Sequence, residues 1–266
     1  MTLPFAQQSF PELYEQVLVG PLFGPWADPL LDEAGLAPSD RVLDVACGTG
    51  IVARRAKVRL GKAGTVVGVD VNAGMIAVAR RIAPDIGWRE GSATALPLEP
   101  EERFDVVTCQ QGLQFVPDKA AGVLQMRCAL AGNGRLAVST WLPDEGFTVL
   151  RELRRVAERH VGVIDDRRHS FGDAGPLAAL LRDAGLRTVQ SHSETRTIRF
   201  PDGLLFARLN ALALIGMSAA AKTLTDTERE RLIDGILRES EPLVAQHTDN
   251  AGFAYEIGAT VTIARA

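Results

Sequence analysis

The stretch RVLDVACGTGIVARRAKVRL, residues 41–60, constrains the fold of this chain more than any other. Residues 41–46 are mostly apolar and predict a strand, a loop with Gly48 and Gly50 follows, and residues 51–60 predict an amphipathic helix. Because a glycine has no Cβ, the loop can turn tightly and its backbone can approach a ligand closely. This order of elements indicates a ligand-binding turn at the end of a strand in an α/β sheet.

The same alternation of Val/Ile-rich runs and amphipathic segments continues along the chain, which predicts a parallel sheet with helices on both faces. The later part differs, because apolar residues at every second position of 253–263 are typical of an antiparallel or half-buried strand. The expected strands are 41–46, 65–70, 86–91, 104–109, 135–141, 188–200 and 253–263. The expected helices are 51–60, 72–83, 118–130, 173–186 and two within 201–247.

Composition and charge argue against several classes of protein. The net charge is −4, and the paired arginines are scattered along the chain, so we expect no nucleic-acid partner. Three cysteines without CxxC spacing indicate neither a disulfide framework nor a metal site, and they suit a cytoplasmic protein. The apolar segment 204–221 carries Arg208 and Asn210, so we predict no stable membrane insertion. No pattern predicts an oligomeric state.

The glycine loop alone is compatible with two cofactors. Residues 48–53 match the G-x-G-x-x-A dinucleotide fingerprint, and Asp70 lies where a ribose-binding acid would stand, so an NAD-dependent oxidoreductase is one alternative. However, Asp44 precedes the loop, where its charge would repel a pyrophosphate and attract a cation. S-adenosylmethionine carries such cationic groups. The chain also lacks the Tyr-x-x-x-Lys spacing of short-chain dehydrogenases.

Three motifs in order resemble those of the class I S-adenosylmethionine-dependent methyltransferases, in particular the small-molecule group that includes the ubiquinone/menaquinone-biosynthesis enzymes. The matching stretches are VLDVACGTG (42–50), VVGVDVNAGMIAVAR (66–80) and GSATALPLEPEERFDVVTCQQGLQFVPD (91–118). The resemblance implies transfer of a methyl group from S-adenosylmethionine to a small-molecule acceptor by in-line displacement. A catalytically silent S-adenosylmethionine-binding partner protein with the same fold is a further alternative.

The resemblance also assigns residues to the cofactor. It implies that Asp44, Ala46, Gly48 and Gly50 surround the methionine part, with Ala46 standing where the family often has its first glycine. Asp70 would accept hydrogen bonds from both ribose hydroxyls. The position of Asp70 is also compatible with a helix N-cap, which is the structural alternative for this residue, and ribose binding is the favoured interpretation.

The adenine end departs from the family pattern. By resemblance, Val71 and Met75 pack on the adenine, although helical spacing also predicts Met75 as a core residue. Many family members place an acid before a small residue after the third strand, whereas this chain has Ser92 and Ala93 there. A serine hydroxyl accepts a hydrogen bond more weakly than a carboxylate, and the N–H of Ala93 remains available for a ring nitrogen.

The segment after the fourth strand and two distant side chains are candidates for the chemistry. By resemblance, Gln110 or Gln111 offers a carbonyl oxygen to the cofactor ammonium, and Gln114 faces the acceptor. The alternative for these glutamines is a polar loop that ends a strand. Tyr14 and His169 are the candidates for a general base, since both lie in segments able to reach the mouth of a pocket.

We predict a single domain over residues 1–266 with a Rossmann-like, seven-stranded, mostly parallel sheet whose last strand is antiparallel. Within it, 36–142 would bind the cofactor, 1–35 would form an N-terminal helical cover, and 201–247 would be a helical insert over the acceptor. The cover would use a run of aromatic residues that could also simply pack on the sheet. These residues are Phe5, Phe10, Tyr14, Phe23 and Trp26.

Overall fold

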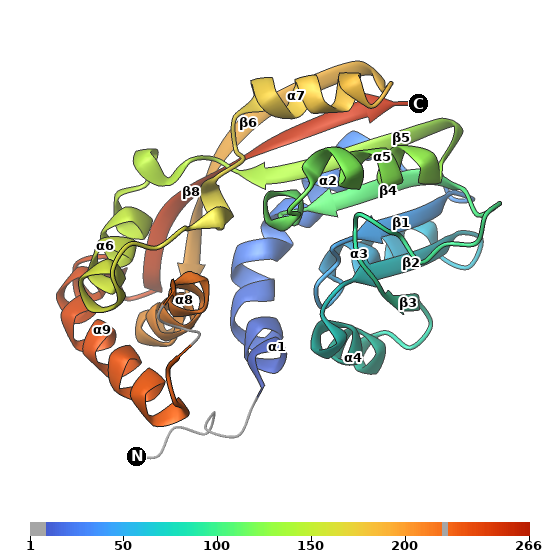
Figure 1. Cartoon of the computed structure of the whole chain (residues 1–266). Helices are drawn as coiled ribbons and strands as arrows, with labels where there is room; N and C mark the ends of the chain where they lie inside the picture. Colours follow the sequence, from blue (N-terminus) through green and yellow to red (C-terminus); the bar gives the residue numbers. More distant parts are fainter. Residues whose placement is uncertain (1–8, 220–222) are drawn as a thin grey trace.

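The computed structural model describes residues 9–219 and 223–266, whose strands form one mixed sheet (Figure 1). The strand order is β3-β2-β1-β4-β5-β8-β6, and the two-residue β7 pairs with β8. The strands are β1 (Arg41–Val45), β2 (Thr65–Asp70), β3 (Gly87–Glu90), β4 (Phe104–Gln110), β5 (Leu130–Trp141), β6 (Arg187–Phe200), β7 (Thr248–Asp249) and β8 (Gly252–Arg265). The strands from β1 to β5 pair in parallel, and β8 runs antiparallel to β5 and β6. This confirms the predicted fold class.

Helices cover both faces of the sheet because side chains of successive strand residues point to opposite sides. Val42 packs with α2, α3 and α4 on one face, whereas the adjacent Leu43 packs with α5 and α7 on the other. The helices are α1 (Phe10–Leu13), α2 (Gly24–Ala34), α3 (Ile51–Leu60), α4 (Ala73–Ile82), α5 (Lys119–Ala129), α6 (Thr148–Val161), α7 (Ala174–Asp183), α8 (Gly203–Met217) and α9 (Asp226–Gln246).

Local signals set the ends of the helices near the loop. Gly50 has a φ of +88° and precedes α3, and Gly61, with a φ of +62°, follows it, as glycine allows. The side chain of Asn72 caps α4 by accepting the N–H groups of Gly74 and Met75 at 2.9 and 3.3 Å. Since Asn72 fills the N-cap position, the alternative that Asp70 is the cap is wrong.

A second core joins the helical insert to the sheet. The ends of β6 and β8 extend beyond the parallel strands and pack through Phe200 and Phe253 against Phe206 of α8. Behind α8, the helices α6 and α9 form a further apolar cluster with it. The two predicted helices of the insert are therefore present as α8 and α9 (Figure 1). No helix in the described parts of the chain is long and apolar enough to cross a membrane.

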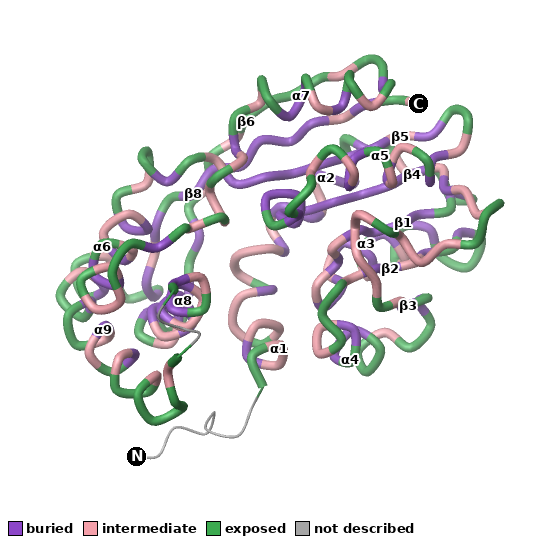
Figure 2. The backbone as a smooth tube through the Cα atoms, viewed as in Figure 1, coloured by how far each residue is buried: buried purple, intermediate pink, exposed green. Residues whose placement is uncertain are grey.

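The N-terminal segment is continuously helical from Phe10 to Ala34, with a π-helical stretch at Tyr14–Phe23 between α1 and α2. Figure 2 shows that much of this stretch is only partly buried. By contrast, α2 belongs to the core, because its Trp26 and Leu30 are almost inaccessible to solvent. Phe5, which we expected in the cover, lies outside the described residues.

Candidate functional site

A cavity of about 480 Å³ lies at the carboxyl ends of β1, β2 and β4. The strand order reverses beside β1, and open α/β sheets bind their ligands at such a point. The volume is in the range of sites for small molecules. Of the predicted site residues, these ten line the cavity: Tyr14, Asp44, Ala46, Gly48, Asp70, Val71, Met75, Gln110, Gln111 and His169.

Asp70 organises the polar end of this cavity. Its Oδ2 accepts the backbone N–H of Gly48, and its Oδ1 accepts the backbone N–H of Asn72, both at 2.8 Å. Gly48 has a φ of +56°, a conformation that favours glycine. Burial raises the pKa of Asp70. The carboxylate thus holds the glycine loop and the turn after β2 next to each other.

Asp44 contributes a second, more deeply buried carboxylate to the polar end of the cavity. Its Oδ2 accepts the N–H of Ala53 at 3.1 Å, and its Oδ1 accepts the hydroxyl of Thr108 at 2.9 Å. Burial raises the pKa of Asp44 to about 7, against the effect of these two hydrogen bonds. No ion pair joins Asp44 to a basic side chain among the described residues. A bound cation would therefore be favoured here.

Two glutamines in the wall of this end have amide oxygens without partners. The Nε2 of Gln110 donates to the carbonyl of Phe23 at 3.1 Å, and the Nε2 of Gln111 donates to Ser139 Oγ at 3.0 Å. The Oε1 atoms of both glutamines are buried and accept no hydrogen bond within the described structure. Because a buried acceptor without a partner is costly, these oxygens suit a ligand with N–H donors or positive charge.

Ala46 and Gln111 line the cavity with strained backbones. Their φ angles are +55° and +54°, a region that residues other than glycine rarely adopt. Gly112 must lack a side chain, because a Cβ there would lie 2.5 Å from the Cβ of Ala46. Such strain is common where a backbone is shaped around a ligand.

Four predicted residues lie outside the cavity wall. Gly50 packs on an indole instead, because a Cβ at this position would stand 2.1 Å from Trp88 Cη2. The hydroxyl of Ser92 bonds to Thr94 Oγ1 at 2.8 Å, within its own turn, and Ala93 follows it. Gln114 is 1% exposed, and its side-chain amide has no partner among the described residues.

Tyr14 covers the glycine loop. An ideal Cβ on Gly48 would lie 3.7 Å from the Tyr14 hydroxyl, and the Tyr14 ring packs on Phe23 with centroids 5.0 Å apart. Burial, and then the charge of Asp70, raises the pKa of Tyr14. A tyrosine with a raised pKa is a poor general base at neutral pH. The position of Tyr14 instead favours a role in covering the glycine loop.

The other end of the cavity is an apolar chamber built by the N-terminal helix, the insert and the last strand. Phe10, Tyr14 and Phe23 of the predicted aromatic cover line it, whereas Trp26 packs behind Trp141. The helix α8 contributes to the wall, and α9 lies behind α8. The apolar residues of this chamber are Leu18, Leu22, Trp141, Leu150, Phe206, Leu209, Ala213, Met217 and Ile257.

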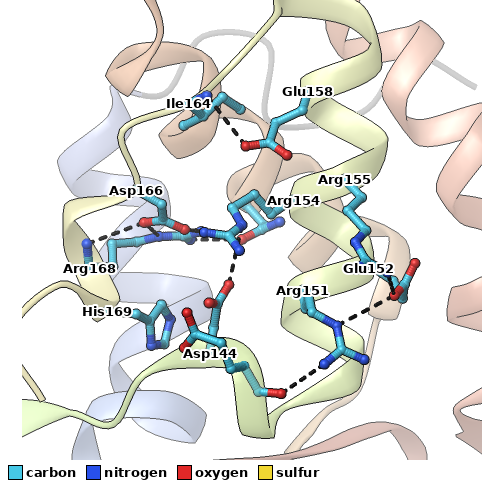
Figure 3. A network of polar contacts seen from close by, with 12 residues as sticks. Asp144, Arg151, Glu152, Arg154, Arg155, Glu158, Ile164, Asp166, Arg168 and His169 are labelled. Atoms are coloured by element: carbon cyan, nitrogen blue, oxygen red, sulfur yellow. Dashed lines mark hydrogen bonds and ion pairs between the residues drawn. The ribbon is translucent and has the colours of Figure 1, made fainter. Parts of the chain in front are cut away.

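A polar network interrupts the apolar chamber (Figure 3). Arg168 lines the cavity and makes a two-pronged contact with Asp166, through Nε to Oδ1 at 2.7 Å and Nη2 to Oδ2 at 2.6 Å. Arg168 Nη1 also donates to Asn210 Oδ1 at 2.8 Å. In the sequence, Arg168 counts only as one of the scattered paired arginines, and Asn210 serves only as an argument against a membrane span. One available signal was the presence of Asn210 in a helix whose only other polar side chain is that of Arg208.

His169 lies next to this network. Its Nδ1 is 2.7 Å from the carbonyl oxygen of Leu142. Because a carbonyl only accepts, Nδ1 carries the proton and Nε2 of the neutral ring is free to accept another. Burial, and then the charge of Arg168, lowers the pKa of His169. The ring is therefore neutral at physiological pH.

Comparisons with known proteins identify the family of this chain. Residues 42–134 match a family model described as "Methyltransferase domain". The chain is 35% identical over 179 residues to the demethylmenaquinone methyltransferase of Beutenbergia cavernae, covering 62% of this chain and 72% of that protein. It is 40% identical over 119 residues to the ubiquinone/menaquinone biosynthesis C-methyltransferase of Xanthomonas oryzae pv. oryzae, covering 42% of this chain. That match spans about half of the relative, 47% of its length.

The whole fold also has solved counterparts. A Haemonchus contortus phosphoethanolamine N-methyltransferase 2, in complex with S-adenosyl-L-methionine, matches with a TM-score of 0.58 and 16% identity. The match covers 98% of this chain and 58% of that one. At this identity the similarity concerns the fold.

Proposed function

Because this chain belongs to the class I S-adenosylmethionine-dependent methyltransferases, we propose that its cavity passes a methyl group from S-adenosylmethionine to an apolar, ring-bearing small molecule. One observation carries the proposal: a single cavity joins an acidic end, walled by Asp44 and Asp70, to an apolar chamber. When bound, the cofactor supplies a methyl group on a positively charged sulfur.

The residues at the polar end fit that cofactor. The Asp44 carboxylate and the partnerless oxygens of Gln110 and Gln111 would accept its cationic methionine part. Asp70 would accept the ribose hydroxyls beside the backbone of Gly48. The described wall has no basic side chain at this end, since its basic residues are Arg168 and His169. A pyrophosphate would therefore meet two carboxylates, which argues against NAD.

The chamber defines the class of acceptor. Its aromatic and aliphatic wall would bury an apolar body and would exclude water from the reaction. The named relatives methylate demethylmenaquinone or act in ubiquinone/menaquinone biosynthesis. We therefore place the acceptor of this enzyme among quinone-type ring compounds, reduced to a form with ring hydroxyls.

The side chains contribute mainly by positioning. The N-terminal cover and α8 hold the acceptor against the polar end, and such orientation supplies much of the rate of a displacement reaction. Nε2 of His169 would accept the proton that leaves the acceptor. Tyr14 would close the loop side of the cavity, and Gln114 would support the wall from behind. The alternative of a silent binding protein predicts cofactor binding without turnover.

Two measurements test the proposal. Calorimetry with S-adenosylhomocysteine and with NAD compares the two cofactors, and only S-adenosylhomocysteine should bind. Incubation of the protein with S-adenosylmethionine and a reduced 1,4-naphthoquinone should then release S-adenosylhomocysteine and a methylated naphthoquinol, detected by mass spectrometry. Binding of S-adenosylhomocysteine with no turnover on a panel of reduced quinones and phenols would instead support the silent alternative.

A further inference from the structure

The guanidinium of Arg168 is fixed at the cavity wall. Asp166 holds its Nε and Nη2 from behind, and the Asp166 side chain is only 2% exposed. Although burial acts to raise it, the pKa of Asp166 lies below its usual value because of the hydrogen bonds and charge of Arg168. These contacts occupy three of the five N–H donors of Arg168, including the one given to Asn210.

The orientation of the Asn210 amide follows from the same contact. An arginine has no acceptor, so the amide oxygen of Asn210 must face Arg168 and the NH₂ group must face elsewhere. Asn210 lines the cavity and is 7% exposed, and its NH₂ group has no hydrogen-bond partner among the described residues. Two donor groups, on Arg168 and Asn210, are thus available at one place in the cavity.

The surroundings make this place unusual. The neighbours of Asn210 on the cavity side of α8 are apolar, namely Phe206, Leu209 and Ala213. A ligand with an apolar body would displace water from this part of the cavity, and each donor left without an acceptor would then cost about 1–3 kcal/mol. An oxygen atom of a ligand would remove that cost.

We propose that Arg168 and Asn210 bind an oxygen of the methyl acceptor and select acceptors that carry an ionisable hydroxyl, phenol or enol, on an apolar body. This inference rests on the function proposed above and names the residues that read the acceptor. The hydroxyl O–H bond breaks, its proton moves to Nε2 of His169, and the electron pair stays on the oxygen facing Arg168. An imidazolium and an oxyanion result. The higher electron density on the deprotonated hydroxyl oxygen makes the acceptor a better nucleophile toward the methyl group.

The charge at this place fits one oxyanion better than a phosphate or a sulfate. Asp166 already balances much of the charge of Arg168, and the described wall offers one other basic side chain, His169. Tyr255 also lies within the electrostatic reach of Arg168 and lines the cavity. A hydroxyl that loses one proton needs no more positive charge than this.

A coloured phenol tests the assignment. The probe is 4-nitro-1-naphthol, whose ionised form absorbs visible light, titrated with pH in the presence of saturating S-adenosylhomocysteine. The wild-type protein should lower the apparent pKa of the bound probe. Asn210→Leu and Arg168→Met should each abolish this lowering and weaken binding of the ionised probe about tenfold or more.

Asn210→Leu keeps the Arg168–Asp166 ion pair intact, so it remains informative if Arg168→Met does not fold. Arg208→Met is the matched control, because Arg208 lies on α8 with Asn210 and pairs with Glu230 away from the cavity. Its side chain is 22% exposed, against 19% for that of Arg168. It should behave as wild type. An unchanged probe pKa and affinity in Asn210→Leu would overturn the assignment.

The failure of the proposed function has a separate signature. Calorimetry with S-adenosylhomocysteine should give one dissociation constant for wild type, Asn210→Leu and Arg208→Met, because none of these changes touches the polar end. If S-adenosylhomocysteine does not bind, the proposed function fails. The probe titration without it still decides whether Arg168 and Asn210 bind an oxyanion.

Discussion

The carboxylate of Asp70, at the end of β2, accepts the backbone N–H of Gly48, in the loop after β1, across 2.8 Å. These two residues come from the first and second motifs of the sequence, and their contact holds both motifs in one wall. The same carboxylate accepts the N–H of Asn72. Asp70 therefore shapes the cavity in addition to facing it.

We expect Asp70→Asn to weaken binding of S-adenosylhomocysteine by roughly tenfold to a hundredfold. Asparagine has one accepting oxygen, and its NH₂ group cannot accept the second of the two backbone N–H groups, those of Gly48 and Asn72, that the carboxylate holds. Asn72→Ala is the comparison. It removes the cap of α4, which should lower the free energy of unfolding by about 1 kcal/mol and leave the affinity nearly unchanged. Calorimetry and urea denaturation measure the two effects. A larger loss of affinity in Asn72→Ala would contradict this division of roles.

Asp44 should make the stability of the ligand-free protein depend on pH. Its pKa is about 7 in the folded state, above the ordinary value of 3.8. Between these values the folded state keeps a proton that the unfolded state has lost, so the free energy of unfolding should fall as the pH rises from about 4 to about 7. Asp44→Asn should flatten this part of the curve, measured by urea denaturation. The exposed Asp85→Asn should leave it unchanged, and parallel curves for wild type and Asp44→Asn would refute the assignment.

Gly50→Ala should lower the free energy of unfolding by more than about 2 kcal/mol, because the new Cβ would overlap Trp88 and the φ of +88° is strained for alanine. Gly35→Ala separates the two causes. Gly35 also has a left-handed backbone, with φ +62° and ψ +61°, but no atom lies within 4 Å of the added Cβ, so only the backbone strain of about 1 kcal/mol applies. Thermal and urea denaturation provide the comparison, and equal losses would show that the Trp88 contact does not matter.

The cover can be tested without disturbing the core. Deletion of residues 1–30 would remove the buried Trp26 and Leu30, so it would test the stability of the fold more than the role of the cover. We expect Leu18→Ala and Leu22→Ala each to raise the KM for the acceptor about tenfold, since each removes apolar area from the chamber. Affinity for S-adenosylhomocysteine should persist. The exposed Gln16→Ala is the control on the same helix, and equal KM values would exclude the cover.

His169→Gln should lower kcat by about a hundredfold or more with the affinity for S-adenosylhomocysteine retained. The pKa of His169 lies below its ordinary 6.5, mainly through burial. In the wild type, kcat should therefore rise with pH up to that lowered pKa and stay level at neutral pH, where the ring is already a base. A pH profile of kcat checks this. A variant with wild-type kcat would show that His169 is not the base.

The elements of the parallel core could be predicted because their causes are local. The apolar runs of 65–70 and 104–109 fill central strands, and the glycines around α3 lie at its ends. Strand and helix limits depend on residues a few positions apart, which a sequence displays directly. The resemblance to the family assigned the carboxylates and amides near the loop to the cofactor, and they come together because strand ends in a parallel sheet meet at one edge.

The acceptor end could not be predicted, because its contacts join residues far apart in the sequence. Arg168 and Asn210 are 42 residues apart, and an arginine pair on a short turn looks solvated until α8 packs against it. Likewise, Gly50 looked like a cofactor contact, and only the packing of the Trp88 indole revealed its structural constraint.

By itself, the sequence determined the order of strands and helices and the identity of the loop, since backbone conformation and burial periodicity are written in neighbouring residues. The tertiary structure decided which side chains share the cavity and which donors it leaves unpaired. Those properties arise when distant segments compete for the same buried space and for the same hydrogen-bond partners.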